Sequence, residues 1–375
     1  MKALITRVLH KLVRESTKLI DSHSLYFNFI PFGNPLQRLA EFTKVGHNSR
    51  VNKKITAPTP RFVEIGNNVS IESLLTKPET YVLIENGSKL CDVYCDCPSI
   101  ITAEGQYRGK YINSNDVTLS VDFEAGVALS HSDKERWHEL RGFWDSRSAV
   151  ERLAELFVKH EIPATWAICG HLFLEECDGE HGFHEADWLG EWFKYDPATN
   201  SKQDSSWYMP ETIKQLAKIP FFEIGYHSFA HFRYQTCSDE TVRRDMSLAQ
   251  QIRKTWGIKL ESFVFPYNEC AHLDILVNEG GFKTYRGNIG TVYPSHGILD
   301  FGTFRFVNTT QMFSPENMDL CFSQLIDLPQ KSSNYYTHCY QWIALDGWEK
   351  LEIWLAQLKD LNACGKIRLK KLGES

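Results

Sequence analysis

The chain has 375 residues, and its 41 lysines and arginines against 47 aspartates and glutamates give a formal net charge of −6. Apolar residues make up 42% of the sequence, which is enough for a packed core and excludes a disordered chain. The acidic balance argues against a nucleic-acid binder, so we expect no nucleic-acid partner. At this length, one barrel of about 250 residues leaves room for a smaller second part.

Residues 2–20 have the periodicity of an amphipathic helix, with apolar residues on one face and basic residues on the other. Such a helix either lies on an anionic membrane surface or packs on its own protein, and the sequence leaves both open. It is not a secretory signal, because Arg7, Lys11 and Arg14 interrupt the apolar stretch that a signal needs. No apolar run reaches the roughly 18 residues of a membrane span. We therefore expect a cytoplasmic protein, with residues 2–20 as the segment for peripheral contact at the inner membrane face.

Residues 22–60 contain several prolines and read as irregular, whereas residues 61–113 contain short runs rich in Val, Ile and Tyr. We expect a small β-rich part there, with strands within 63–71, 80–87, 98–105 and 110–113. No internal repeat is visible. The N-terminal segment 1–112 thus combines a helix with short strands, and no motif in it indicates a role.

Three of the ten cysteines lie close together at Cys91, Cys95 and Cys97. Without an export signal, reduced thiols are the favoured interpretation. A thiolate metal site is the alternative, although no second Cys/His pair follows at zinc-finger spacing.

From Val117 the pattern changes to alternating strands and helices. The expected strands are residues 117–123, 164–170, 221–228, 261–267, 283–287 and 334–340. The expected helices are residues 146–162, 210–219, 239–256 and 348–361, and residues 275–282 read as the end of another. This alternation predicts an α/β domain over residues 113–375, with a parallel sheet closed as a barrel.

Polar residues that can carry chemistry follow two of these strands. Asp122 and Glu124 lie two residues apart at the end of an apolar strand, where carboxylates are costly unless they are paired, bound to metal or functional. His227 and His231 are four residues apart, a spacing that presents two imidazoles to one metal ion. The alternatives are a solvated carboxylate pair at the rim and two surface histidines. Together, two histidines and Glu124 would make a His₂-carboxylate site with open positions for water.

These stretches, followed by Phe263-Val264-Phe265-Pro266-Tyr267-Asn268, resemble in order and spacing the polysaccharide deacetylase family (carbohydrate esterase family 4, the NodB homology domain). The most specific part is FEIGYHSFAH, which is similar to the HEIGSHSFTH of the family. ATWAICGHLF looks like the second strand of the family, and Tyr336-Thr337-His338 looks like its late strand. The resemblance covers roughly residues 115–370 and implies a distorted (β/α) barrel with fewer than eight repeats.

The resemblance also implies roles for individual residues. Three positions match the metal ligands of the family: Glu124, His227 and His231. Asp122 matches the general base, and His338 matches the general acid. Tyr267 matches the position whose backbone N–H helps to form the oxyanion hole. The implied cofactor is a divalent metal, most often Zn²⁺.

Two motifs of the family are altered here. The third motif usually carries an arginine that orients the base, and Val264 occupies its place. Arg286 or Arg305 are the candidates to supply the guanidinium instead, and their spacing does not decide between them. The fourth motif, an Asp and a Trp beside the catalytic histidine, has no clean match, and Asp300 is a weak candidate.

The resemblance therefore implies a metal-dependent carbohydrate N-deacetylase, a hydrolase of linear amide bonds. Its partner would be an N-acetylated sugar or glycan in cell-envelope or surface polysaccharide metabolism. A non-catalytic relative that binds glycan in the same pocket is the first alternative. Deamidation or ring opening of a cyclic amide is the second, and it fits less well because metal-free relatives of that kind lack the histidine pair.

Overall fold

The computed structural model describes most of the chain from residue 49 onward. The described residues are 49–56, 63–66, 68–76, 81–91, 93–95, 97–112, 114–127, 147–183, 196–289, 297–327, 332–344 and 347–375. The helix predicted for residues 2–20 lies outside them. The chain divides into two compact units, Met1–Tyr107 with Ile289–Thr291, and Arg108–Asn288 with Val292–Ser375. We describe each unit by itself.

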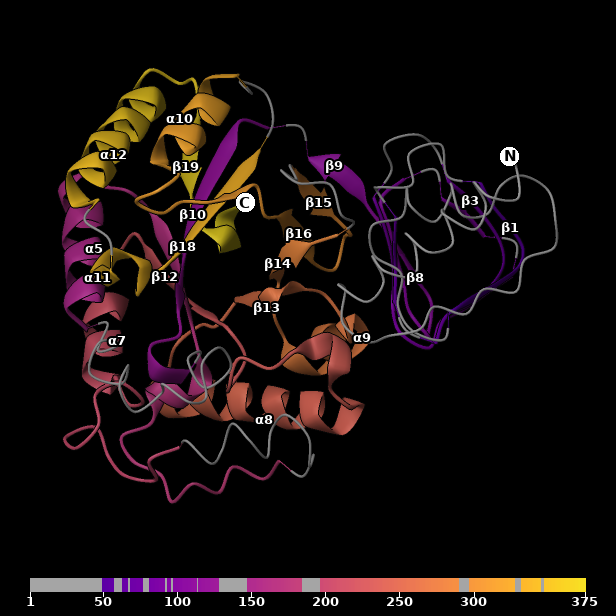
Figure 1. Ribbon diagram of the computed structural model, residues 1–375, viewed down its shortest axis with the longest axis horizontal. Coiled ribbons are helices and arrows are strands. Elements are labelled where there is room, and N and C mark those ends of the chain that lie inside the picture. The colour runs from indigo at the N-terminus through magenta and orange to yellow at the C-terminus, as the bar shows by residue number, and fades with distance from the viewer. Residues whose placement is uncertain are drawn as a thin grey trace, which may run out of the picture. The chain divides into compact units, whose positions relative to one another are not determined.

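The described part of the first unit is built from two small sheets that the chain visits in alternation (Figure 1). One sheet contains β1 (Arg50–Thr56), β3 (Ser70–Thr76), β5 (Lys89–Leu90) and β6 (Val93–Cys95). The other contains β2 (Val63–Ile65), β4 (Val82–Ile84), β7 (Ser99–Ile101) and β8 (Gln106–Arg108). β1 lies in a region that the prolines indicated to be irregular, and this expectation is wrong. The short strands predicted after it are present.

Parallel pairing makes this unit a solenoid. Val63 pairs with Val82, and Val82 pairs with Ser99, so the chain returns to the same sheet after 19 and then 17 residues. Ser70 pairs in parallel with Lys89 in the other sheet, again 19 residues later. The unit is therefore an internal repeat. The sequence did not reveal it, because successive coils share only inward apolar positions and vary in length.

The interior of the solenoid is a continuous apolar core. It contains Val63, Ile65, Val69, Ile71, Leu74, Val82, Ile84, Leu90, Cys95 and Ile101. Cys95 is thus a core residue, whereas Cys91 is exposed, and neither forms a disulfide. Burial of small apolar side chains between stacked coils accounts for Cys95 without any chemical role.

The second unit is an α/β structure, which confirms the expected class. Its sheet has the order β17-β18-β10-β11-β12-β13-β14-β16-β15-β9, with β19 beside β10. The strands are β9 (Lys110–Ile112), β10 (Asp116–Phe123), β11 (Ala164–Ile168), β12 (Phe222–Tyr226), β13 (Ser262–Glu269), β14 (Thr284–Asn288), β15 (Ile298–Asp300), β16 (Arg305–Asn308), β17 (Gln311–Met312), β18 (Ser333–His338) and β19 (Arg368–Lys370). Pairing is parallel from β17 to β16, and β15 is antiparallel to its neighbours. Among the described residues, the pairing is an open series that does not close into a complete barrel.

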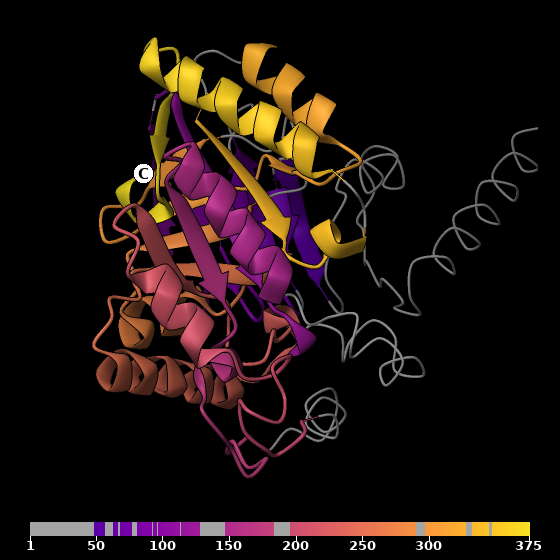
Figure 2. The same cartoon turned by 90° about the vertical axis from the view of Figure 1, so that its left-hand side faces the viewer.

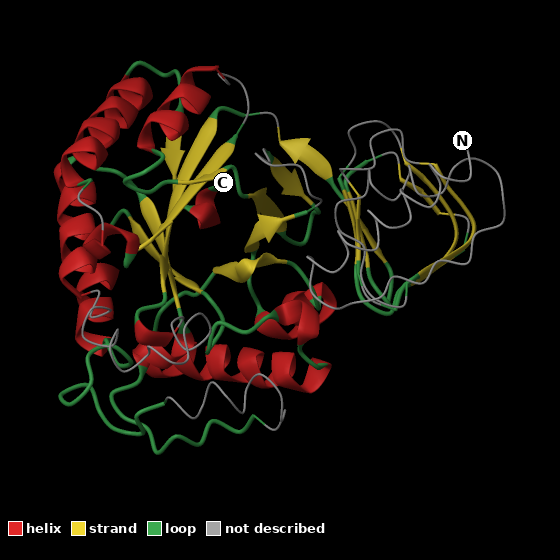
Figure 3. Ribbon diagram, in the orientation of Figure 1, coloured by secondary structure: helices red, strands yellow, loops and turns green. Residues whose placement is uncertain are grey.

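Helices connect the strands and cover the sheet (Figures 2 and 3). They are α5 (Arg147–Lys159), α7 (Pro210–Ala217), α8 (Asp239–Trp256), α9 (Leu273–Ile275), α10 (Met318–Asp327), α11 (Gln341–Ala344) and α12 (Trp348–Ala363). Short helical turns occur at η2 (Gly170–Phe173), η3 (Tyr234–Thr236), η4 (Leu276–Gly280) and η5 (Leu372–Glu374). Figure 2 shows α5, α7 and α12 lying across the strands.

The bounds of α8 follow directly from its sequence. Ser238 caps its start by accepting a hydrogen bond from the Thr241 N–H, and Asp239 and Glu240 complement the positive end of the helix dipole. Gly257, in the left-handed conformation, ends it. The prediction of a helix over residues 239–256 is confirmed.

Within the described part of the chain, none of the helices has the length and apolar character that crossing a bilayer requires.

Candidate active site

The predicted site residues meet where parallel strands of the second unit end. β10 carries Asp122 next to its last residue, and Glu124 follows directly. His227 comes immediately after β12, and His338 is the last residue of β18. The register of β10 and β18 places Asp122 opposite His338. The carboxyl ends of parallel strands lie at one edge of the sheet, and this brings together residues that are more than 200 positions apart.

Three side chains converge in the arrangement predicted for metal ligands. Glu124 Oε1 lies 3.2 Å from His227 Nε2 and 3.1 Å from His231 Nε2. All three residues are buried, and their ligand atoms lie within 4.8 Å of one another. A metal with bonds of about 2.0–2.2 Å at tetrahedral angles would hold such atoms about 3.3 Å apart. The donor set and its spacing fit a divalent cation.

The hydrogen bond of His227 supports this fit. Its Nδ1 lies 2.8 Å from the Val264 carbonyl oxygen. A carbonyl can only accept, so Nδ1 carries a proton and Nε2 of the neutral ring has a lone pair. That lone pair faces the Glu124 carboxylate, and two acceptors at this distance need a shared proton or a cation between them. This is the tautomer that metal-binding histidines adopt.

The electrostatics of the cluster favour the deprotonated forms of Glu124 and His231. Burial acts to raise the pKa of Glu124, but the neighbouring imidazoles of His231 and His338 and hydrogen bonds with His227 and His231 hold it well below its ordinary value. Burial lowers the pKa of His231. Both shifts favour the deprotonated side chains, which are the forms that bind a metal.

Asp122, on β10, is held by a guanidinium from β14, which β11, β12 and β13 separate from β10 in the order of the sheet. Arg286 Nη1 donates to Asp122 Oδ1 at 2.9 Å, and Arg286 Nη2 donates to Oδ2 at 2.8 Å. Both side chains are buried. Asp122 Oδ2 also lies 4.0 Å from His227 Nε2, beyond a hydrogen bond. Asp122 thus stands beside the ligand cluster, fixed in orientation by a bidentate pair.

The position of Arg286 decides between the two arginines that the sequence left open. β13 and β14 pair in parallel with Val264 opposite Arg286, so the guanidinium comes from the strand next to the altered motif. Arg305 instead donates to the carbonyl oxygen of Ser375. Sequence spacing could not show this, because no local pattern determines how β13 and β14 align.

His338 faces the same cluster from the opposite strand. Its Nε2 lies 3.5 Å from Glu124 Oε1 and 3.9 Å from Asp122 Oδ2. Its Nδ1 is buried and has no hydrogen-bond partner among the described residues. Asp300 does not orient it, because Asp300 accepts from the Gly302 N–H at 2.9 Å and pairs with Lys110 at 3.3 Å.

Tyr267 lies against the histidine ligands. Its ring centroid is 4.6 Å from that of His231, and the Arg233 guanidinium stacks on it at 4.1 Å. The backbone of Tyr267 is left-handed, with φ +57°, and so is that of Asn268, with φ +56°. Together they form the irregular end of β13.

Backbone strain is concentrated around this site. Besides Tyr267 and Asn268, non-glycine residues with positive φ include Ala125 (+48°), Ser228 (+63°) and His231 (+56°). Each adjoins or is a site residue. Left-handed conformations of such residues cost free energy and persist where the surroundings impose them, as at active sites.

The residue that imposes this geometry on the histidine loop was not found from the sequence. Asp245, buried on α8, accepts hydrogen bonds from the Phe229 N–H at 2.8 Å and from the Tyr226 hydroxyl at 2.6 Å. It thereby holds the segment between His227 and His231. The signal in the sequence was an acidic residue at a position where the helical periodicity requires an apolar one.

Comparisons with known proteins agree with this arrangement. Residues 140–278 match the family model described as polysaccharide deacetylase. No curated protein matches the chain significantly. The matched segment contains both histidine ligands and Tyr267, whereas Asp122, Glu124, Arg286 and His338 lie outside it and are brought to it by the fold.

Several solved structures are similar to the chain at low identity. One, from Mycobacterium smegmatis, is assigned to the polysaccharide deacetylases. It has 14% identity and a TM-score of 0.49, and the match covers 70% of this chain and 88% of that one. A pseudoenzyme of carbohydrate esterase family 4 from Bacillus anthracis has 13% identity, coverage of 70% and 65%, and a TM-score of 0.39. A family 4 carbohydrate esterase from the same organism has 15% identity, coverage of 70% and 84%, and a TM-score of 0.35.

Proposed function

Because residues 140–278 match the family model described as polysaccharide deacetylase, we propose that the chain is a metal-dependent hydrolase that removes the N-acetyl group from an N-acetylated sugar or glycan. The observation that carries the proposal is the convergence of Glu124, His227 and His231 beside a carboxylate, Asp122, that a buried arginine fixes in place. A divalent metal, most often Zn²⁺ with such ligands, supplies charge that polarises an acetyl carbonyl and lowers the pKa of water.

Asp122 is proposed as the general base. Its two oxygens accept hydrogen bonds from Arg286, and each retains a lone pair for a further donor. It accepts the proton of the water that attacks the acetyl carbonyl. Arg286 orients the Asp122 carboxylate, which stands apart from the three ligands and is therefore available to accept a proton.

His338 and Tyr267 are proposed to act on the two sides of the tetrahedral intermediate. The Tyr267 N–H donates to the oxyanion, where one such donor contributes about 2.7–4 kcal/mol. His338 protonates the departing nitrogen, because an amine leaves an amide carbon slowly unless it is protonated. The products are acetate and a free amino sugar.

Paired variants test these roles. We expect His227→Ala to lose both bound metal and acetate release, because it removes a ligand. We expect Asp122→Asn to keep the metal and lose turnover, because the amide keeps the shape of the carboxylate but cannot accept a proton. Metal analysis, together with acetate release from free, nucleotide-linked and polymeric N-acetyl sugars, measures both. Equal loss of metal in the two variants would contradict the assignment.

One observation favours the second candidate function, a non-catalytic relative that binds glycan in the same pocket. The Nδ1 atom of His338 has no carboxylate or other partner among the described residues to orient the ring. Such a protein would bind N-acetylated oligosaccharides and release no acetate from any of the substrates. Binding without acetate release, in metal-loaded protein, would identify it.

A further inference from the structure

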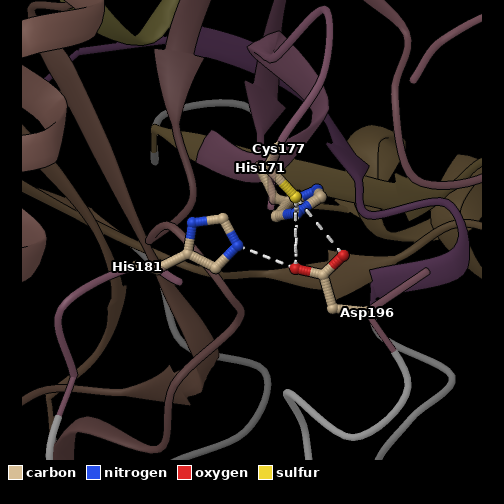
Figure 4. A group of neighbouring side chains, drawn as sticks. All are labelled: His171, Cys177, His181 and Asp196. Carbon is tan, nitrogen blue, oxygen red and sulfur yellow. Dashed lines mark hydrogen bonds and ion pairs between the residues drawn. The ribbon is translucent and has the colours of Figure 1, made fainter. Parts of the chain in front are cut away.

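A second group of metal-binding side chains lies outside the site described above. His171 belongs to η2, directly after β11, and three more such residues follow in the loop that leads to α7 (Figure 4). They are Cys177, His181 and Asp196. Figure 4 shows the four side chains gathered together, with the Asp196 carboxylate facing the His181 ring and the Cys177 sulfur.

The distances within this group match a tetrahedral zinc shell. Zinc bonds of about 2.0–2.3 Å at tetrahedral angles separate the ligand atoms by about 3.3–3.6 Å. Asp196 Oδ2 lies 3.2 Å from His171 Nε2, and Cys177 Sγ lies 3.7 Å from His171 Nε2 and 3.5 Å from both carboxylate oxygens. His181 Nε2 is closer to Asp196 Oδ2, at 2.7 Å. The set of one sulfur, two nitrogens and one oxygen is typical of zinc.

The hydrogen bonds around the group prepare its atoms for a cation. His171 Nδ1 donates to the Trp207 carbonyl oxygen at 3.0 Å, so Nε2 is the nitrogen that faces Asp196 and that a metal would bind in place of a proton. The Ala198 N–H donates to Asp196 Oδ1 at 2.9 Å and orients the carboxylate. Partners of this kind fix the tautomer of a histidine ligand and the direction of a carboxylate ligand.

The surroundings of the Cys177 sulfur also suit a metal ligand. The Tyr208 hydroxyl accepts from the Thr199 N–H at 3.1 Å and lies 3.0 Å from Cys177 Sγ, so its own hydrogen points toward the sulfur or Asp196. Hydrogen-bonding groups of His171, Asp196 and Tyr208 thus surround the sulfur, which suits a thiolate ligand.

We propose that His171, Cys177, His181 and Asp196 form a second metal centre, a structural zinc site. Four protein ligands leave no open position for water or substrate, which distinguishes this site from the three-ligand site of the catalytic proposal. The side chains of His171 and Asp196 are fully buried, and that of His181 is 6% exposed. A cavity of about 740 Å³, which Cys177 and His181 help to line, connects the group with solvent.

The proposed zinc site would hold together the long connection between η2 and α7. Between η2 and α7, residues 174–183 and 196–209 contain no helix or strand, and their one isolated bridge joins Glu176 and Asn200. Described stretches of this length without a helix or strand are uncommon in compact domains unless something holds them. A metal that binds His171 at the sheet and three residues in the loop supplies that link, and its binding free energy contributes to folding.

Cobalt substitution tests the proposal, because this site contains a cysteine and the group of Glu124, His227 and His231 does not. We expect the full chain, purified without chelator, to hold two equivalents of zinc. After exchange with Co²⁺ we expect a near-ultraviolet charge-transfer band from thiolate to cobalt. Cys177→Ser should remove the band and one equivalent, whereas Cys364→Ser, at an exposed thiol, should keep both.

Further variants separate this proposal from the catalytic one. His231→Ala should lose the other equivalent and keep the charge-transfer band, and the band does not depend on acetate release. If Cys177→Ser does not fold, Asp196→Asn is the variant to test instead. It should weaken zinc binding at least about tenfold, as measured by competition with a chromophoric chelator. Cobalt-loaded wild-type protein without a thiolate band, or a band that persists in Cys177→Ser, would show that the group is only a hydrogen-bonded cluster.

Discussion

Exchange of Arg286 for lysine tests how far the candidate base depends on its guanidinium. Arg286 is buried and gives two hydrogen bonds to Asp122, of 2.9 and 2.8 Å, and a third of 3.1 Å to Ser120. Lysine keeps the positive charge but cannot donate to both carboxylate oxygens in the planar, forked geometry of arginine. Arg286→Lys therefore removes orientation without removing the charge.

The magnitude follows from the bonds that are lost. One charge-assisted hydrogen bond contributes about 1.5–3 kcal/mol, so we expect kcat/KM for acetate release to fall about 10- to 150-fold. Bound metal should stay at the wild-type level, because the hydrogen bonds of Arg286 go to Ser120 and Asp122 and to none of the three ligands. Acetate release and metal content are measured on the same preparation.

The matched control is the same exchange at the other arginine that the sequence suggested. Arg305 binds the carbonyl oxygen of Ser375, so Arg305→Lys should leave kcat/KM close to the wild-type value. If both variants lose activity equally, or if Arg286→Lys turns over like wild type, the role of Arg286 as the positioning residue of the base is refuted. Loss of metal in Arg286→Lys would also refute it.

Two further predictions concern stability. Asp245→Ala leaves the buried Tyr226 hydroxyl and the Phe229 N–H without their acceptor. It should therefore lower the free energy of unfolding, measured by denaturant titration, by about 3 kcal/mol. A change below about 1 kcal/mol would contradict the role of Asp245 in holding the segment between His227 and His231. Gly170→Ala places a Cβ 2.9 Å from the rings of Phe229 and Tyr226 and should lower the free energy of unfolding by about 1–3 kcal/mol. The control is Gly105→Ala, whose Cβ meets nothing within 4 Å and which should leave stability unchanged. Equal shifts of the melting temperature in the two variants would contradict the packing argument.

The sequence predicted the second unit well because its signals are local. The helix over residues 239–256 begins and ends where its capping residues indicate, and Asp122, Glu124, His227 and His231 meet because each lies at the end of a predicted strand. What the sequence could not provide is register. The pairing of Val264 with Arg286 depends on how two strands align, and no local pattern encodes that alignment.

The features that were missed depend on contacts between distant segments. The solenoid coils return to their sheets after 17 to 20 residues with little shared sequence, so no repeat was recognised. His171, Cys177, His181 and Asp196 have irregular spacings of six, four and fifteen residues in a loop, and they become a ligand set only when the loop folds back. Spacing rules apply where ligands share a helix or a hairpin, and these residues share neither.

The place of Arg286 bears on how enzymes of this type are recognised and engineered. The proposed base, Asp122, receives its guanidinium from β14, at the position that pairs with Val264 on β13. A search pattern that demands arginine before the Pro-Tyr pair would therefore reject this chain, although a buried arginine holds Asp122. The same geometry suggests a relocation experiment: in a Val264→Arg, Arg286→Val double variant the charge returns to the other strand, and recovery of turnover would show that the two positions are interchangeable.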